Sequence, residues 1–331
     1  MEIVVLIIGF ALVFDFYNGM NDAANSIATI VSTRVLTPLQ AVVWAAFFNF
    51  VAAFAFGVSV ATTIGKGLVD VNIVDNFVIF SGLIGAIILT ATATHLGLPI
   101  SVSHAIIGGY GGAALIKAGI GAIIISGYTK VLIFIFLAPV IGMLMAYIFS
   151  IITLWVVKDM PPRTVDKYFR KLQLVSAALY SLSHGSNDAQ KTIGIISIVL
   201  FTNKLLGETF YVPFWVIILS HSVIALGTLL GGWKVIRTLG MRVTKLTPFG
   251  GFSAETAAGL TIIGATMGGI PVSTTHTITG AIIGVGSVKG FSAVRWGVAK
   301  NILWAWVLTI PLSAIFAMLT YSAIIYVVNL F

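Results

Sequence analysis

Long apolar stretches separated by short polar segments run along the whole chain. They cover residues 2–33, 38–64, 77–96, 98–116 and 120–157, and then 172–202, 211–233, 248–268, 270–288 and 293–329. A membrane helix needs about 20 predominantly apolar residues. The pattern therefore predicts five crossing-equivalents in each half of the chain and about ten to twelve membrane elements in total. Gly, Pro, Asn and Asp interrupt several stretches, which predicts broken or re-entrant helices at those places.

The composition agrees with a chain that lies mostly inside a membrane. Hydrophobic residues make up 59% of the 331 residues and charged residues only 8%, whereas a soluble domain carries about 25% charged residues. The first fifteen residues contain Glu2 but no basic residue. They are therefore predicted to form the first membrane helix and not a cleaved signal peptide. The expected fold is an all-helical, multi-pass membrane protein.

Two polar motifs occur twice inside this apolar sequence. The segment 19–26 (GMNDAANS) returns as 185–192 (GSNDAQKT), and 97–104 (GLPISVSH) returns as 269–276 (GIPVSTTH). The two copies keep the same order and nearly the same spacing, which indicates an internal duplication.

The duplication divides the chain into two repeats that we expect to have inverted topology. The predicted units are a first repeat at 1–157, a cytoplasmic linker at 158–171 and a second repeat at 172–331. Basic residues are concentrated in the linker and in the loop 234–245, so both should face the cytoplasm. The loop 65–76 holds more acidic than basic residues and should lie outside, together with the N-terminus. The net charge of +8 is then a feature of membrane orientation and does not indicate a nucleic-acid partner.

The first motif pair has the residue types of a cation site. An Asp near the middle of a bilayer costs about 2.5–3.5 kcal/mol, so two of them at repeat-related positions indicate a function. Carboxylate and amide oxygens suit a hard cation at a repeat interface. In the second copy Lys191 replaces the Asn of the first, and its ammonium could neutralise Asp188 or contact an anion. The candidate sodium ligands are Asn21, Asp22, Asn25, Asn187 and Asp188, with the metal ion at Asp22 and Asp188.

The second motif pair has the residue types of an anion cradle. After Pro99 and Pro271 a run of hydroxyl residues opens a Gly-rich apolar helix. The unpaired N–H groups and the positive end of such a helix favour a bound anion. Ordinary capping of the helix by Ser or Thr is the alternative interpretation. The candidate phosphate ligands are Ser101, Ser103, Ser273, Thr274, Thr275, Thr277, Gln190 and Lys191.

Further polar residues lie close to these motifs or within other apolar stretches. His104 and His276 are repeat mates beside the predicted anion cradle, and His184 precedes the second Asp motif. Each is a candidate for a proton relay or for orienting the ligands, with an ordinary packing role as the alternative. Asp15 and Glu255 also fall inside predicted spans and are candidates for gating or for an ion path.

The paired Gly-x-Asn-Asp motifs and Pro-x-Ser hairpins resemble those of the inorganic phosphate transporter (PiT) family. The resemblance covers both halves of the chain and is greatest for short prokaryotic, sodium-dependent members, because only a brief linker joins the repeats. It implies uptake of inorganic phosphate together with a cation, at a site between inverted repeats. Family members differ in coupling ion, since some use sodium and others use protons, and some relatives carry sulfate.

The prediction is therefore a sodium-coupled phosphate symporter of the cytoplasmic membrane that works by alternating access. The alternatives are a proton-coupled phosphate or metal-phosphate symporter, a sulfate permease of the same fold and, more remotely, a passive ion channel. An enzyme is not expected, because no nucleophile, base and orienting group follow in recognisable order. We expect no cofactor, with sodium ions as a co-substrate. The expected partners are inorganic phosphate, sodium or protons, and the lipid bilayer, and the apolar exterior permits a homodimer.

Overall fold

The computed structural model describes residues 1–330, without the side chains of residues 240–242. Within that range the chain forms twelve α-helices and three short 3-10 helices. In chain order these are α1 (Glu2–Ser32), α2 (Pro38–Val51), η1 (Ala52–Phe54), α3 (Ser59–Lys66), α4 (Asn76–Leu96), α5 (Val102–Ala118), η2 (Ile120–Ala122), α6 (Ile125–Val156), α7 (Pro162–Thr202), α8 (Phe214–Leu230), α9 (Trp233–Arg242), α10 (Pro248–Met267), α11 (Thr274–Val288), η3 (Phe291–Ala293) and α12 (Trp296–Val328).

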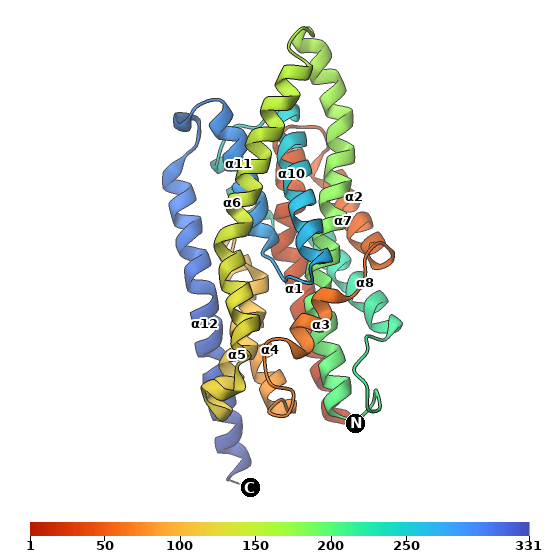
Figure 1. The fold of residues 1–331 in the computed structure, drawn as a ribbon, viewed down its shortest axis with the longest axis vertical. Helices are drawn as coiled ribbons and strands as arrows, with labels where there is room; N and C mark the ends of the chain where they lie inside the picture. The colour runs from red at the N-terminus through yellow and green to blue at the C-terminus, as the bar shows by residue number, and fades with distance from the viewer. Residues whose placement is uncertain (331) are drawn as a thin grey trace.

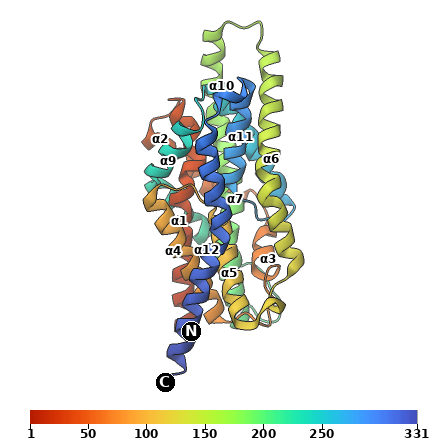
Figure 2. The ribbon, with the colours of Figure 1, turned by 90° about the vertical axis from the view of Figure 1, so that its left-hand side faces the viewer.

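The helices follow the same order twice. Helices α1 to α6 of the first half correspond in order to α7 to α12 of the second half, and all pairs except α1 and α7 have similar lengths. The N- and C-termini lie at one end of the molecule and the turn between α6 and α7 lies at the opposite end (Figures 1 and 2). Each half therefore begins at one end and finishes at the other, which places the two repeats in opposite orientations, as the sequence predicts.

Each repeat contains a bent helix pair. The axis turns by 81° between Pro38–Phe54 and Ser59–Lys66, and by 77° between Phe214–Leu230 and Trp233–Leu239. Four helices are long and apolar enough to cross a membrane by themselves, and six spans result if each bent pair is counted as one. The sequence predicts a basic loop at 234–245, but the structure places the helix α9 over most of that segment.

Each repeat also contains a helical hairpin, which is α4–α5 in the first half and α10–α11 in the second. The two hairpins enter the molecule from opposite ends (Figure 1). Gly97 and Gly269 reverse the chain at the hairpin tips with φ of +76° and +66°, a region that a side chain with a Cβ adopts only at a cost. The predicted break at each Gly-x-Pro-x-Ser motif is therefore confirmed.

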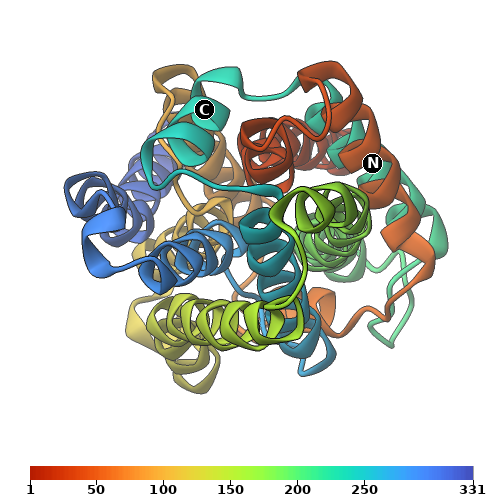
Figure 3. The same ribbon diagram turned by 90° about the horizontal axis from the view of Figure 1, so that it is seen from above.

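The repeats are interlocked. Helix α6 packs against the hairpin α10–α11 of the other repeat, and α12 packs against the hairpin α4–α5. Viewed from above, α6 and α12 lie at the periphery, whereas α1, α7 and α10 lie further inside (Figure 3). The arrangement brings the middles of α1 and α7 and both hairpin tips into one central region.

The first polar motif does not interrupt its helix, in contrast to the sequence prediction. Helix α1 runs without a break through 19–26, and α7 runs through 185–192. The two glycines instead allow close approach of a neighbouring helix, because a Cβ at Gly19 would meet the backbone of Ile224 and one at Gly185 would meet the backbone of Asn49. These glycines are small residues at helix contacts and not helix breakers.

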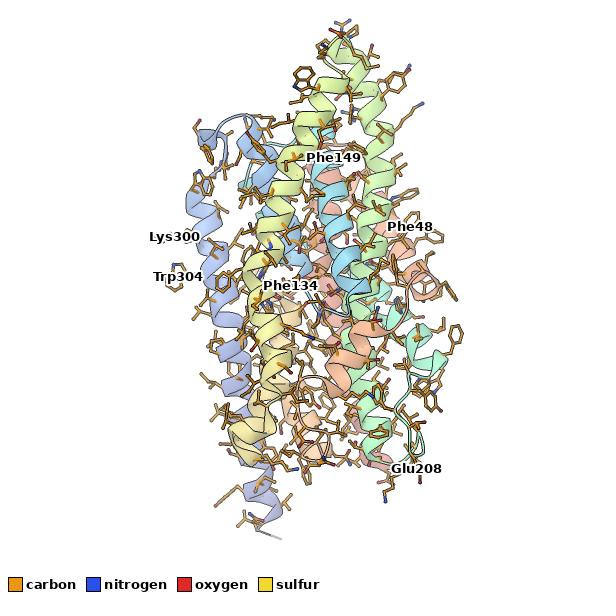
Figure 4. All side chains as sticks on the ribbon, in the orientation of Figure 1. Phe48, Phe134, Phe149, Glu208, Lys300 and Trp304 are labelled. Carbon is orange, nitrogen blue, oxygen red and sulfur yellow. The ribbon has the colours of Figure 1, made fainter. Side chains whose placement is uncertain are left out.

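The exterior of the bundle is apolar. Large hydrophobic side chains are exposed along α6 and α12, including Phe136, Ile152, Trp304 and Leu319. Trp304 points away from the body of the molecule (Figure 4). An exposed apolar surface of this extent on long helices fits contact with lipid, and the chain is a multi-pass membrane protein.

Candidate ion-binding site

Two aspartates and a histidine meet at the centre of the molecule. Asp22 comes from the middle of α1, and His184 and Asp188 come from the middle of α7. All three are buried, and each offers a ligand atom within 4.8 Å of the other two. His184 Nε2 lies 3.0 Å from Asp188 Oδ2 and 3.9 Å from Asp22 Oδ2. The repeat-related carboxylates that the sequence predicts to act together therefore share one small buried volume.

The tip of the second hairpin closes over the two carboxylates. Thr274 Oγ1 donates to Asp188 Oδ2 at 2.9 Å and is 3.4 Å from Asp22 Oδ2. Thr275 Oγ1 donates to Asp22 Oδ1 at 3.1 Å and accepts from Asn25 Nδ2 at 2.9 Å. Both hydroxyl residues stand in the first turn of α11, so the acid pair and the N-terminus of α11 form one unit.

Lys191 is buried beside Asp188. Its ammonium forms an ion pair with Asp188 Oδ1 and donates to the carbonyl of Val272 at 3.2 Å. A buried charge needs a partner of opposite sign, and Asp188 provides it. Of the two roles that the sequence allows for Lys191, the structure shows neutralisation of Asp188.

The two hairpins contact each other at the same place. Ser103 Oγ of α5 donates to the carbonyl of Val272 at 3.1 Å. Ser101 and Ser273 cap α5 and α11, each accepting from a backbone N–H of its own helix at 3.2 Å. The N-termini of α5 and α11 thus meet, and the first N–H groups of a helix have no partner within it. The arrangement concentrates hydrogen-bond donors and positive dipole ends at one point.

One hydrogen bond in each repeat anchors the hairpin to a long helix, which is α1 for the first hairpin and α7 for the second. Asn21 Nδ2 donates to Thr94 Oγ1, and Asn187 Nδ2 donates to Thr266 Oγ1, both at 2.9 Å. Asn187 also lies 3.3 Å from the carbonyl of Ile270. These Asn side chains hold the hairpins against α1 and α7, while their buried Oδ1 atoms have no partner among the described residues.

The two histidines of the hairpins lie against each other. The ring centroids of His104 and His276 are 4.6 Å apart, and His276 also stacks on Trp306 of α12 at 3.7 Å. Both rings are buried. Among residues 1–330 no hydrogen bond or ion pair joins either ring to Asp22 or Asp188, so the position of the two histidines fits packing better than a proton relay.

Two predicted phosphate ligands have other partners in the structure. Gln190 accepts from the N–H groups of Val60 and Ala61 at 2.9 and 3.1 Å and donates to Ser186, so it joins α7 to the start of α3. Thr277 donates to the carbonyl of Ser273 within its own helix. Within the described part of the chain, no hydrogen bond joins either side chain to Asp22 or Asp188.

Sequence reasoning overlooked a residue that orients His184. Asn49 of α2 lies in the middle of an apolar stretch; its Oδ1 is 3.1 Å from His184 Nδ1, and its Nδ2 donates to Thr228 at 3.0 Å. With Nδ1 donating to Asn49, the other ring nitrogen, Nε2, faces the carboxylates. A single amide in an otherwise apolar span was the available signal.

The two other buried acids of the spans differ in their surroundings. Glu255 of α10 accepts from Thr29, Gln173 and Ser176 at 2.5–3.0 Å, so both of its oxygens are satisfied. Asp15 of α1 is equally buried, but neither of its oxygens has a hydrogen-bond partner among residues 1–330.

The family model described as the phosphate transporter family matches the chain twice, at residues 18–165 and 157–317. The chain belongs to the phosphate transporter family. The double match agrees with the internal duplication and covers both central motifs. A family member is a transporter, so the expectation that the chain is not an enzyme is confirmed.

Relatives cover nearly the whole chain. A probable low-affinity inorganic phosphate transporter of Rhizobium meliloti is 54% identical over 96% of this chain and 95% of its own length. A protein of Bacillus subtilis with the same description is 42% identical over 96% of both chains. Among solved structures, the sodium-dependent phosphate transporter matches with a TM-score of 0.88 and 28% identity, over 98% of this chain and 99% of that one.

Proposed function

We propose that this family member carries inorganic phosphate across the cytoplasmic membrane together with sodium, by alternating access around the central site. The observation that carries the proposal is the position of Asp22 and Asp188, which face each other from two inverted repeats beneath the tips of both hairpins. The descriptions of the relatives and of the solved neighbour support phosphate and sodium as the transported species.

Phosphate would bind at the meeting point of the hairpins. The N-termini of α5 and α11 supply N–H groups and positive dipole ends, which favour a tetrahedral oxyanion. The hydroxyl groups of the two tips lie around the same point. Those of Ser101 and Ser273 accept from backbone N–H groups and keep their own hydrogen to donate. Those of Ser103, Thr274 and Thr275 would exchange their present acceptors for phosphate oxygens.

A cation is needed because the acid pair would repel the anion. Like charges about 4 Å apart cost on the order of 4 kcal/mol at an effective dielectric constant of 20. A cation between carboxylate and phosphate reverses the sign of that interaction. Phosphate then binds well only together with the cation, and this mutual dependence is the thermodynamic basis of coupling.

Asp22 is the preferred place for the mobile cation. Asp188 already has the ammonium of Lys191 as its counter-charge, whereas no lysine or arginine pairs with Asp22 among the described side chains. Asp22 has the hydroxyls of Thr274 and Thr275 beside it, and Asn25 one turn further along α1. Sodium at Asp188, which the sequence also predicts, would have to displace Lys191.

Proton coupling is the second candidate, and His184 is the observation that favours it. Its Nδ1 is held by Asn49, and its Nε2 faces both carboxylates. A proton on Nε2 would place a positive charge in the position where a metal ion is otherwise needed.

The decisive experiment is phosphate uptake into proteoliposomes that contain the purified chain. An inward sodium gradient and a matched proton gradient are applied separately, with Asp22→Asn beside the wild type. Uptake that needs sodium and is lost in the variant supports the proposal. Uptake driven by the proton gradient alone contradicts sodium coupling and assigns the carboxylates to proton transfer. Sulfate uptake in place of phosphate uptake would contradict the assigned substrate.

A further inference from the structure

Asp15 is a buried acid that the central site does not use. It lies seven residues before Asp22 on α1, which is about 10 Å along a helix, and its side chain is 0% exposed. Neither of its carboxylate oxygens has a hydrogen-bond partner among the described residues. An ionised carboxylate without a partner in the interior costs several kcal/mol, so something outside the chain must compensate it.

Two further polar side chains face this carboxylate. They are the amide of Asn18, one turn further along α1, and the hydroxyl of Thr192 on α7. Both are 1% exposed, and their polar atoms also have no partner within the described part of the chain. Three neighbouring side chains from two helices thus bring together carboxylate, amide and hydroxyl oxygens that have no partner among the described residues.

Asp15, Asn18 and Thr192 lie on the same helix faces as the central acid pair. Asp15, Asn18 and Asp22 are spaced by three and four residues, which puts them on one face of α1. On α7 the spacing of four residues from Asp188 to Thr192 does the same. The two helices run in opposite directions (Figure 1), so Asp15 and Thr192 are displaced from the acid pair in the same direction, towards the end of the molecule that carries the N-terminus.

Glu255 is a buried carboxylate whose hydrogen bonds are all supplied by the chain itself, in contrast to Asp15. Three side chains donate to its two oxygens. At Asp15 the Thr192 hydroxyl and the Asn18 amide lie close enough to interact with the carboxylate, but within the described part of the chain neither forms a hydrogen bond of ordinary length and angle with it, although both carry donors. Oxygen-only ligands with a single negative charge suit a hard monovalent cation.

We propose that Asp15, Asn18 and Thr192 form a second sodium site, separate from the acid pair and about two helical turns from it. The proposal rests on sodium-coupled transport at Asp22 and adds one bound ion to it. The charged groups nearest to Asp15 beyond its ligands are Asp188 and Lys191. They are paired with each other, and so they leave the charge of Asp15 for the ion.

The test is to count the sodium ions that the purified full-length protein binds in the absence of phosphate, by equilibrium dialysis with radiolabelled sodium. Asp15→Asn should lose one bound ion per chain relative to the wild type, Asp22→Asn should lose a different one, and the double variant should lose both. Thr192→Val should weaken the binding of the ion that Asp15→Asn loses, whereas Thr192→Ser should retain it. Ser150→Ala removes another buried, unpartnered hydroxyl, on α6, and should leave the count unchanged.

The outcomes separate this inference from the proposed function. If Asp15→Asn and Thr192→Val bind as much sodium as the wild type while Asp22→Asn binds less, the second site is wrong and sodium coupling at Asp22 stands. If the wild type binds no sodium, sodium coupling itself fails, and the second site with it. If Asp15→Asn keeps the sodium count but releases one proton fewer on a shift to high pH, Asp15 holds a proton and the metal site is overturned.

Discussion

The two repeats have nearly the same scaffold but different charges. Asn21 and Asn187 anchor the two hairpins through hydrogen bonds of equal length to Thr94 and Thr266, and Ser101 and Ser273 cap the two hairpin helices in the same way. The serine caps and the anchors are thus shared features of the architecture.

The charged and hydroxyl positions around the acid pair are not shared. Where the first repeat has Asn25, the second has Lys191. Where the first has Asn18, the second has His184, and where the second has Thr274, the first has the apolar Val102. The permanent positive charge, that of Lys191, and the bridging hydroxyl, that of Thr274, therefore both belong to the second repeat. The comparison teaches that duplication supplied a symmetric frame in which the chain itself neutralises Asp188, whereas Asp22 pairs with no lysine or arginine among the described side chains, as the proposed cation site requires.

The largest expected effect comes from breaking the ion pair of the second repeat. Asp188→Asn leaves the Lys191 ammonium buried without a counter-charge and should destabilise the protein by about 3–5 kcal/mol. Asp22→Asn leaves no such ammonium and should be much less destabilising, although both variants should lose coupled uptake. Denaturant unfolding in detergent, followed by tryptophan fluorescence, measures the difference. The double variant Asp188→Asn/Lys191→Asn should recover most of the lost stability; equal destabilisation by the two single variants would contradict the asymmetry.

The second largest effect is expected when Lys191 is replaced by Asn, the residue at the equivalent position 25 of the first repeat. Lys191→Asn gives the second motif the residue of the first and frees Asp188 for an external ion. We expect weaker uptake at low sodium, recovery at high sodium, and a steeper dependence of the uptake rate on sodium concentration, because one more ion must bind. Lys191→Met, which offers no oxygen ligand, serves as the matched control and should not recover. An unchanged sodium dependence in Lys191→Asn would show that Lys191 does not replace a cation.

A smaller effect tests the part of the scaffold that the repeats share. Asn21→Leu and Asn187→Leu each remove one anchoring hydrogen bond, so each should cost about 0.5–1.5 kcal/mol. The loss should be slightly larger for Asn187, which also contacts the carbonyl of Ile270. The same unfolding assay checks this, and a much larger loss in only one repeat would mean that the two anchors are not equivalent.

The smallest effect is expected from single-cysteine substitutions, which test the predicted orientation of the chain in the membrane. The chain has no cysteine, so Met160→Cys and Glu208→Cys each introduce a single reactive thiol at an exposed position. Residue 160 belongs to the turn between α6 and α7 at one end of the molecule (Figure 1), and Glu208 lies near the opposite end (Figure 4). The loop charges predict that residue 160 faces the cytoplasm. A membrane-impermeant thiol reagent should therefore label residue 208 but not residue 160 from outside intact cells, with uptake unchanged. The reverse labelling would overturn the predicted topology.

Much of the architecture could be read from the apolar pattern. Most of the apolar stretches coincide with observed helices, although 38–64 is divided between α2 and α3, and α7 begins at Pro162, within the predicted linker. The glycine and proline of each hairpin motif marked the two reversals, because both residues act locally on the backbone. The same local reasoning failed at Gly19 and Gly185, where the helix continues and the glycine serves a neighbouring helix. It also missed α9, whose basic residues resembled those of a loop.

The candidate site, too, could be predicted from the sequence only in part. The sequence alone determined that the chain is a duplicated membrane protein and that Asp22 and Asp188 belong together, because burial of an acid in an apolar span is costly wherever the span packs. Only the tertiary structure decided which groups each carboxylate meets. It paired Lys191 with Asp188, joined Gln190 to α3 and brought Asn49 to His184. It also satisfied Glu255 and left Asp15 without a hydrogen-bond partner among residues 1–330. Those contacts join residues of different helices, and helix packing sets their distances, which no spacing along one chain can encode.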